Sequence, residues 1–300
     1  ATLNWNSALF IDDMTPQRNT ALSLLNNDSG KTQWPIFLTG SEFSSEPNFF
    51  LRLGVTELTG EAGCGKTQIA LSVCVTCACS RVKMPDSIGG MSFGRAIFVS
   101  LGDSSSQSRI AKRLSQMAAA RVNGDSPTLE GETVVSILSR ILLKYVRNRD
   151  ELFSFLHEEL PKVMEQNPAI SLVVFDSITS IFVMSRENYP SEAIERTLYL
   201  FKVSSQMKKL SEMHLTPFLV INQVRANVTS SINDDVIPAL GLSWKSCINQ
   251  RYFLSRISSL MLTNDSNLNK RIIRMEFSPY TYSWWQIFEI GTSGTKIKMT

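Results

Sequence analysis

Short apolar runs alternate with longer amphipathic stretches from about residue 55 to residue 221, and this alternation predicts an α/β fold. Buried parallel strands read as continuous apolar runs, and the helices that cover them read as stretches with one apolar face. The predicted strands are Val55–Leu58, Ala96–Leu101, Ile141–Val146, Leu172–Phe175 and Pro217–Ile221. The predicted helices are Lys66–Ser80, Ser108–Val122, Arg149–Glu165 and Ser191–His214. We therefore expect a twisted, mostly parallel sheet flanked by helices.

The last predicted helix carries apolar residues at a spacing that places them on one face. These residues are Ile194, Leu198, Phe201 and Leu210. A helix that covers a sheet buries its apolar stripe against the strands. We therefore expect this stripe to face the sheet.

The pattern changes at both ends of the chain. After residue 250, segments such as "KRIIRMEFSP" and "SWWQIFEIG" are separated by polar turns, which predicts a C-terminal β meander. Residues 1–34 are rich in Asn, Ser and Thr and are interrupted by proline. We expect residues 1–34 to be a linker or oligomerisation lead-in and residues 35–300 to form the folded core.

Composition narrows the class of protein without identifying it. An apolar content of 43% over 300 residues is ample for one large core. The formal net charge of +3 is too mild to indicate a nucleic-acid-binding protein by itself. A membrane span needs roughly 18 or more consecutive apolar residues, and the sequence has no such run. The opening "ATLNWNSALF" also lacks the basic start and apolar run of a secretory signal.

The cysteine pattern indicates a role in core packing rather than in disulfides or a metal site. Their number is odd, and three of them crowd into one predicted helix, which argues against a disulfide framework. The Cys74–Cys77 pair has zinc-like spacing, but no second Cys or His pair accompanies it. We expect the cysteines to behave as small buried hydrophobic residues.

The segment "GEAGCGKT", Gly60 to Thr67, matches the phosphate-loop pattern G-x-x-x-x-G-K-T between a predicted strand and a predicted helix. Backbone N–H groups of such a loop wrap phosphates at the positive end of the helix. Lys66 is expected to reach the terminal phosphates, and Thr67 is expected to hold Mg²⁺. The predicted nucleotide-binding residues in and beside the loop are Gly60, Glu61, Ala62, Gly63, Cys64, Gly65, Lys66, Thr67 and Gln68.

The buried strand in "ISLVVFDS" ends in Asp176. In phosphate-loop proteins a strand-end carboxylate of this kind contacts Mg²⁺ together with the loop Thr. Any core strand can end in Asp, so the signal depends on the phosphate loop that precedes it. Together, Thr67 and Asp176 predict a Mg²⁺ site beside the nucleotide phosphates.

Four segments resemble, in order and spacing, the RecA-like strand-exchange recombinases of archaea and eukaryotes: "GEAGCGKTQIALS", "VVFDSITS", "PFLVINQV" and "IPALGLSW". The narrower resemblance is to the eukaryotic recombinase paralogues, in the branch of the third X-ray-repair cross-complementing paralogue. It is carried by "PALGLSWKSCINQRYFLSR" and "KRIIRMEFSP" and covers about residue 35 to the end. It implies a RecA-like P-loop ATPase core that binds ATP and Mg²⁺.

The resemblance assigns further roles by position. Gln223 matches the glutamine that senses the γ-phosphate and relays it to a DNA-binding loop. Residues 224–243 match the second DNA loop, and residues 185–191 lie where the first loop is expected. Arg109 falls where family members stack an arginine on the adenine, a use that suits a planar guanidinium. An exposed helix arginine is the alternative for Arg109.

The stretch "FVSLGDSSS" departs from the family at a catalytic position. The catalytic glutamate of the family falls on Gly102, which has no side chain to orient a water molecule. Asp103 is adjacent, but successive strand residues point to opposite faces. We expect ATP binding with slow or absent hydrolysis, and Asp103 as the displaced catalytic acid is the rival hypothesis. Glu61 is a second possible substitute.

The residues predicted to contact DNA are few. They are Arg186, Arg196 and Arg225, and a solvated surface explains their charges about as well as DNA does. The second loop also contains Asp234 and Asp235, whereas phosphate contacts need clustered Lys and Arg. Binding of single-stranded or branched DNA by this chain alone is therefore expected to be modest and sensitive to salt.

The lead-in segment "WNSA" resembles the aromatic-x-x-Ala tether by which family members add a strand to a neighbouring subunit. It predicts Trp5 and Ala8 as oligomerisation residues, although a four-residue match is common by chance. The resemblance implies another recombinase paralogue chain as partner and a nuclear location, with an additional cytoplasmic location left open. Three hypotheses remain: a subunit that uses ATP as an assembly switch, an autonomous DNA-stimulated ATPase, and a scaffold without nucleotide.

Overall fold

The computed structural model describes residues 51–84, 90–102, 107–124, 129, 131–182, 190–226, 236–257 and 270–297. The predicted lead-in, residues 1–34, lies outside these ranges. The division of the chain into a lead-in and a core therefore stays a prediction.

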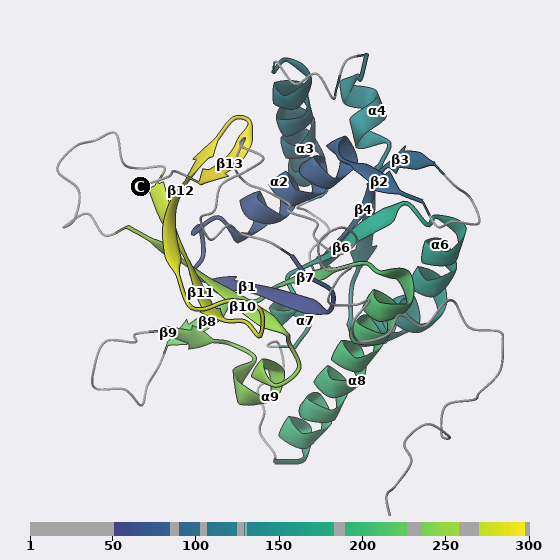
Figure 1. The fold of residues 1–300 in the computed structure, drawn as a ribbon. Coiled ribbons are helices and arrows are strands. Elements are labelled where there is room, and N and C mark those ends of the chain that lie inside the picture. The colour runs from purple at the N-terminus through teal and green to yellow at the C-terminus, as the bar shows by residue number, and fades with distance from the viewer. Residues whose placement is uncertain are drawn as a thin grey trace, which may run out of the picture. The chain divides into compact units, whose positions relative to one another are not determined.

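The strands of the described residues form a nine-stranded sheet in the order β13-β12-β11-β10-β1-β7-β6-β4-β5 (Figure 1). The strands from β10 to β5 in this order are parallel, and β10 to β13 are antiparallel. The bounds are β1 Val55–Gly60, β4 Arg95–Leu101, β5 Ile141–Val146, β6 Ile170–Asp176, β7 Phe218–Ile221, β10 Gln250–Arg256, β11 Lys270–Phe277, β12 Trp285–Gly291 and β13 Gly294–Ile297. This architecture confirms the predicted mostly parallel sheet and its C-terminal antiparallel extension.

Two small hairpins stand beside the main sheet. They are β2 Arg81–Lys83 with β3 Met91–Phe93, and β8 Val224–Ala226 with β9 Val236–Pro238. The predictions did not include them, because strands of three residues are too short to show a periodicity.

Helices cover both faces of the sheet, as Figure 1 shows. One face packs against α2 Lys66–Cys79, α3 Gln107–Val122 and α4 Val134–Leu138. The other packs against α5 Arg149–Ser154, α6 Leu160–Gln166, α7 Thr179–Phe182, α8 Pro190–His214 and the region of α9 Gly241–Lys245. Alternate residues of the central strands enter the two cores: Phe98 and Val174 enter one, and Val99 and Phe175 the other.

The helix predicted over Arg149–Glu165 is interrupted. Between α5 and α6 the chain forms a short π-helical segment, Phe155–Glu159. Pro161 lies in the first turn of α6 and has no N–H to donate to the preceding turn.

The prediction that the apolar stripe of the last helix faces the sheet is wrong for three of its four residues. Ile194, Leu198 and Phe201 are exposed, at 62%, 56% and 44%. The residues of α8 that enter the core are Leu200, Val203, Met207 and Leu210. The helix carries two apolar stripes, and its sequence does not reveal which one meets the strands.

The cysteines of the described residues are buried, with Cys79 half-buried, as expected for small hydrophobic residues. Burial raises the pKa of Cys77 to about 12 and that of Cys79 to about 11, so both are thiols at neutral pH. Among the described helices, none has the length and apolar character needed to cross a membrane.

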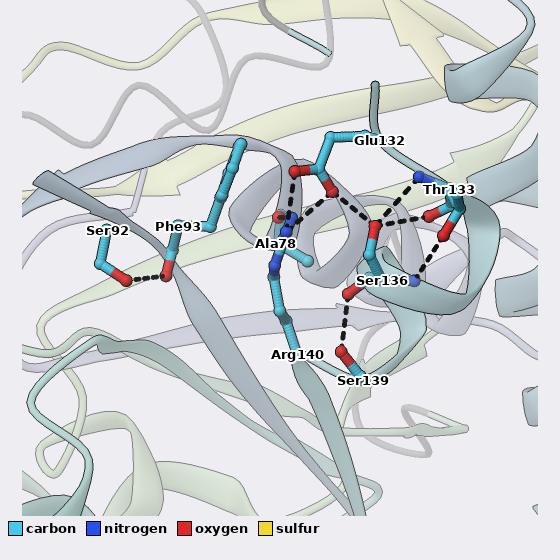
Figure 2. Close-up of polar contacts among 8 residues, drawn as sticks. All are labelled: Ala78, Ser92, Phe93, Glu132, Thr133, Ser136, Ser139 and Arg140. Atoms are coloured by element: carbon cyan, nitrogen blue, oxygen red, sulfur yellow. Dashed lines mark hydrogen bonds and ion pairs between the residues drawn. The ribbon is translucent and has the colours of Figure 1, made fainter. Parts of the chain in front are cut away.

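A polar cluster fixes α4 to the end of α2 and to the β2–β3 hairpin (Figure 2). The Arg140 guanidinium donates to both Glu132 carboxylate oxygens, at 3.0 and 2.7 Å, and to the Ala78 carbonyl at 3.0 Å. It also lies 3.9 Å from the centre of the Phe93 ring. The Ser136 hydroxyl and the Arg140 guanidinium hold the pKa of Glu132 below its ordinary value. Arg140 therefore joins three elements that are distant in sequence.

Replacement of Arg140 by alanine is expected to lower the free energy of unfolding by about 2 kcal/mol, because charge-assisted hydrogen bonds and a cation–π contact are lost together. Thermal unfolding of the purified variant measures this change. Arg95→Ala is the matched control, because exposed Arg95 makes one 3.2 Å bond to Asn167. Equal midpoints for the two variants would contradict a stabilising role of the cluster.

Candidate functional site

The loop "GEAGCGKT" connects the end of β1 to the start of α2, as predicted. Because β1, β7, β6 and β4 are parallel, their C-terminal ends meet at the same edge of the sheet. This edge is the usual ligand-binding edge of open α/β sheets. The site is therefore built from strand ends that are far apart in sequence.

Lys66 points back into its own loop. Its side chain is buried, with 8% of the residue exposed, and its Nζ donates to the carbonyls of Gly60 and Glu61, both at 2.7 Å. The Cys64 sulfur lies 3.8 Å from the same nitrogen. A buried ammonium group that is bonded to the loop carbonyls is well placed to bind an anion in the loop.

Thr67 and Asp176 meet, as the sequence predicted. The Thr67 hydroxyl donates to Asp176 Oδ2 at 2.6 Å, although β7 separates β6 from β1 in the sheet. Burial raises the pKa of Asp176, while the Thr67 hydrogen bond and the Lys66 charge act in the opposite direction. Hydroxyl and carboxylate oxygens are the ligands that Mg²⁺ prefers. The donor set therefore fits a hard divalent cation.

Gln223 lies just past the end of β7, at the same edge of the sheet as the loop. Its backbone N–H donates to Thr179 Oγ1 at 2.9 Å, and its carbonyl accepts from the N–H of Ala239 at 2.8 Å. The Gln223 side chain is exposed. Its backbone thus joins α7 to the segment that follows β9, while the amide stays accessible.

The backbone conformation at the end of β4 favours glycine. Gly102 has a φ of +85°, a left-handed conformation that disfavours other residues. A Cβ atom at this position would also lie 3.0 Å from the Cβ and Oγ of Ser180. The Ser180 hydroxyl donates to the Leu101 carbonyl at 2.7 Å, which holds it against the strand end. A glutamate at position 102 would therefore be strained in this backbone.

Gln68, the first residue after the phosphate-loop motif, is held by an arginine that the sequence did not indicate. Arg113 Nε, on α3, donates to Gln68 Oε1 at 2.7 Å, and its Nη1 donates to the Thr292 carbonyl at 3.0 Å. Arg109, one turn earlier on α3, is exposed. The adenine-stacking role of Arg109 stays a prediction, and Arg113 secures α2 to the β12–β13 turn.

A second unpredicted cluster lies around β1, the strand that leads into the loop. Glu57, in β1, is fully buried and accepts hydrogen bonds from Asn222 Nδ2 at 2.6 Å, from Trp244 Nε1 at 2.9 Å and from Arg251 Nε. Burial raises the pKa of Glu57, and the Arg251 charge and the three donors oppose this effect. The sequence did not indicate that Glu57 is buried, because glutamate is usually exposed and is buried only with partners.

Several predicted residues are not brought to the loop or lie outside the described part. Arg225 is exposed on β8, and Arg196 is half-buried on α8. Asp103, Arg186, Trp5 and Ala8 lie outside the described residues, as do residues 185–189 of the first predicted DNA loop and 227–235 of the second. The assignments of these residues stay predictions.

Sequence comparison finds known proteins that are similar to this chain. A family model described as Rad51 matches residues 49–294. "DNA repair protein XRCC3 homolog" of Arabidopsis thaliana is 25% identical over 259 residues, covering 75% of this chain and 80% of the relative. "DNA repair protein XRCC3" of Mus musculus is 25% identical over 237 residues, covering 76% of this chain and 64% of the relative.

A third relative comes from a different lineage. "DNA repair and recombination protein RadA" of Metallosphaera sedula is 28% identical over 243 residues, covering 81% of this chain and 65% of the relative. The chain thus spans less than two thirds of the mouse and Metallosphaera relatives. The matches confirm the resemblance to RecA-like recombinases and to the XRCC3 branch that the motifs indicated.

Proposed function

The chain belongs to the Rad51 family, and on this premise we propose that it is a recombinase paralogue subunit that binds Mg²⁺ and ATP and supports homologous-recombination repair of DNA. Nucleotide acts in it mainly as a switch for assembly and conformation. A ligand shifts such an equilibrium only by binding one state better than the other.

One observation carries the nucleotide part of the proposal: Thr67 and Asp176 lie in hydrogen-bond contact beside a buried Lys66. With ATP bound, Lys66 would contact the terminal phosphates, and Thr67 with Asp176 would hold Mg²⁺, which would supply neutralisation of the phosphate charge. The chain's own residues bind and orient the nucleotide, and the family resemblance assigns Arg109 to stacking on the adenine.

The switch role rests on the end of β4. The left-handed backbone at Gly102 and the close approach of Ser180 would strain the family's catalytic glutamate at this position. Without a group to orient water, hydrolysis is slow or absent while binding persists. The alternative function is an autonomous DNA-stimulated ATPase in which Asp103 is the displaced acid.

Single-turnover phosphate release separates these two functions. With wild-type protein, bound Mg-ATP and single-stranded DNA, we expect no release beyond that of free ATP during the life of the complex. Binding is verified first by nucleotide retention. Clear turnover that disappears in Asp103→Ala would overturn the switch and support the alternative. Glu61→Ala tests the remaining acid in the same assay.

The partner, DNA and location parts of the proposal follow from the family resemblance. A second recombinase paralogue is the expected partner, held in part by Trp5 and Ala8. Contacts to single-stranded or branched DNA are assigned to Arg186, Arg196 and Arg225, with Gln223 relaying the nucleotide state. The site of action is the nucleus. Co-purification with a paralogue that is lost in Trp5→Ala tests the tether.

A further inference from the structure

Arg256 ends strand β10, next to the strand that leads into the phosphate loop. β10 runs parallel to β1, and the register pairs Leu254 with Gly60. Side chains two positions apart on a strand point to the same face. Arg256 therefore leaves the sheet on the same face as Leu254, which packs in the core beneath α2.

The Arg256 guanidinium lies on the loop itself. Its Nη2 donates to the Ala62 carbonyl at 2.8 Å. Gly63 has a φ of +74°, and a Cβ atom there would overlap Arg256 Nη2. Position 63 thus favours glycine through its left-handed backbone, and a side chain there would displace the Arg256 guanidinium.

Two cations hold three successive carbonyls of the loop. Lys66 Nζ binds those of Gly60 and Glu61 from the buried side, and exposed Arg256 binds that of Ala62. In a trans peptide the carbonyl and the following N–H point in opposite directions. A carbonyl fixed by Arg256 therefore turns the Gly63 N–H away from the guanidinium, and N–H groups of such loops are the ones that wrap phosphates.

We propose that Arg256 is a positioning residue of the phosphate site: it fixes the Ala62–Gly63 peptide for phosphate binding and adds a second positive charge beside Lys66. The inference rests on the proposed nucleotide function and extends it to a strand outside the motif. ATP carries more negative phosphate charge than ADP. The positive charge of Arg256 is therefore expected to favour ATP over ADP.

Binding of Mg-ATP and Mg-ADP to Arg256→Gln tests the proposal. Loss of a charge-assisted contact is expected to weaken ATP binding about tenfold and ADP binding less. Arg256→Lys keeps the charge without the planar fork and is expected to fall between glutamine and wild type. Arg274→Gln is the control, since it removes one charge from an exposed site on neighbouring β11, over the Phe253 ring.

Thermal unfolding without nucleotide shows whether Arg256 is merely structural. Without nucleotide, we expect the unfolding midpoint of Arg256→Gln to match that of wild type. The increase in midpoint on adding ATP is expected to be smaller for the variant. Three results would each overturn the inference: ATP affinity of Arg256→Gln within twofold of wild type, an equal loss in Arg274→Gln, or a nucleotide-free midpoint lowered enough to explain the loss. If wild-type protein does not bind ATP at all, the proposed function fails first and this inference fails with it.

Discussion

Replacement of Glu57 by alanine is expected to lower the free energy of unfolding by roughly 3–5 kcal/mol, the range for a buried ion pair that loses one partner. The carboxylate is fully buried, and Arg251 is only 3% exposed. Without Glu57, Arg251 keeps only the longer ion pair with Glu276 among the described residues, at 3.6 Å. The Trp244 and Asn222 donors also lose the acceptor that they share.

The midpoint of urea unfolding measures this loss. Glu276→Ala is the matched control, because its side chain is 31% exposed and its contact with Arg251 is long. We expect the control to change stability by less than about 1 kcal/mol. A Glu57→Ala variant as stable as this control would show that the cluster is not needed for the fold.

A double replacement separates pairing from packing in the same cluster. Glu57→Met combined with Arg251→Met removes both charges and keeps apolar volume. Buried ion pairs exchanged for apolar residues of similar volume are often neutral or stabilising. We expect the double variant to be more stable than Glu57→Ala. The reverse order would mean that the charges themselves are required.

Replacement of Lys66 by alanine is expected to weaken ATP binding by about a hundredfold. Two charge-assisted hydrogen bonds to the terminal phosphates, at about 1.5 kcal/mol or more each, account for this factor. Because the Lys66 ammonium in this structure already holds the Gly60 and Glu61 carbonyls, its removal also releases the loop. Titration of a fluorescent ATP analogue in the presence of Mg²⁺ measures the change.

The control for Lys66 is Lys144→Ala. Lys144 lies on β5, the edge strand of the sheet, is partly exposed and forms a 2.6 Å ion pair with Glu159. Its loss is expected to leave ATP affinity unchanged. The nucleotide-free unfolding midpoint of Lys66→Ala separates loss of binding from loss of fold. Unchanged ATP affinity in Lys66→Ala would refute nucleotide binding at this loop and favour the scaffold hypothesis.

Local sequence was sufficient where the signal is local. The phosphate-loop motif requires a fixed spacing between strand and helix, so the positions of β1, the loop and α2 followed from it. Continuous apolar runs located the central strands, and the meeting of Thr67 with Asp176 followed from parallel strands sharing one edge. The helical interruption before Pro161 was not predicted, although proline is a local signal for such a break. The orientation of α8 was not predicted because it depends on how the helix packs rather than on its period.

By itself, the sequence determined the family, the mostly parallel sheet and the loop with Lys66 and Thr67, because each of these depends on residue type and spacing along the chain. Tertiary structure alone decided that Glu57 is buried with Arg251, that Arg113 holds Gln68 and that Arg256 reaches Ala62. These contacts join residues 45 or 194 positions apart. The physical reason is that strand order and register bring them together, and neither is encoded in a local pattern.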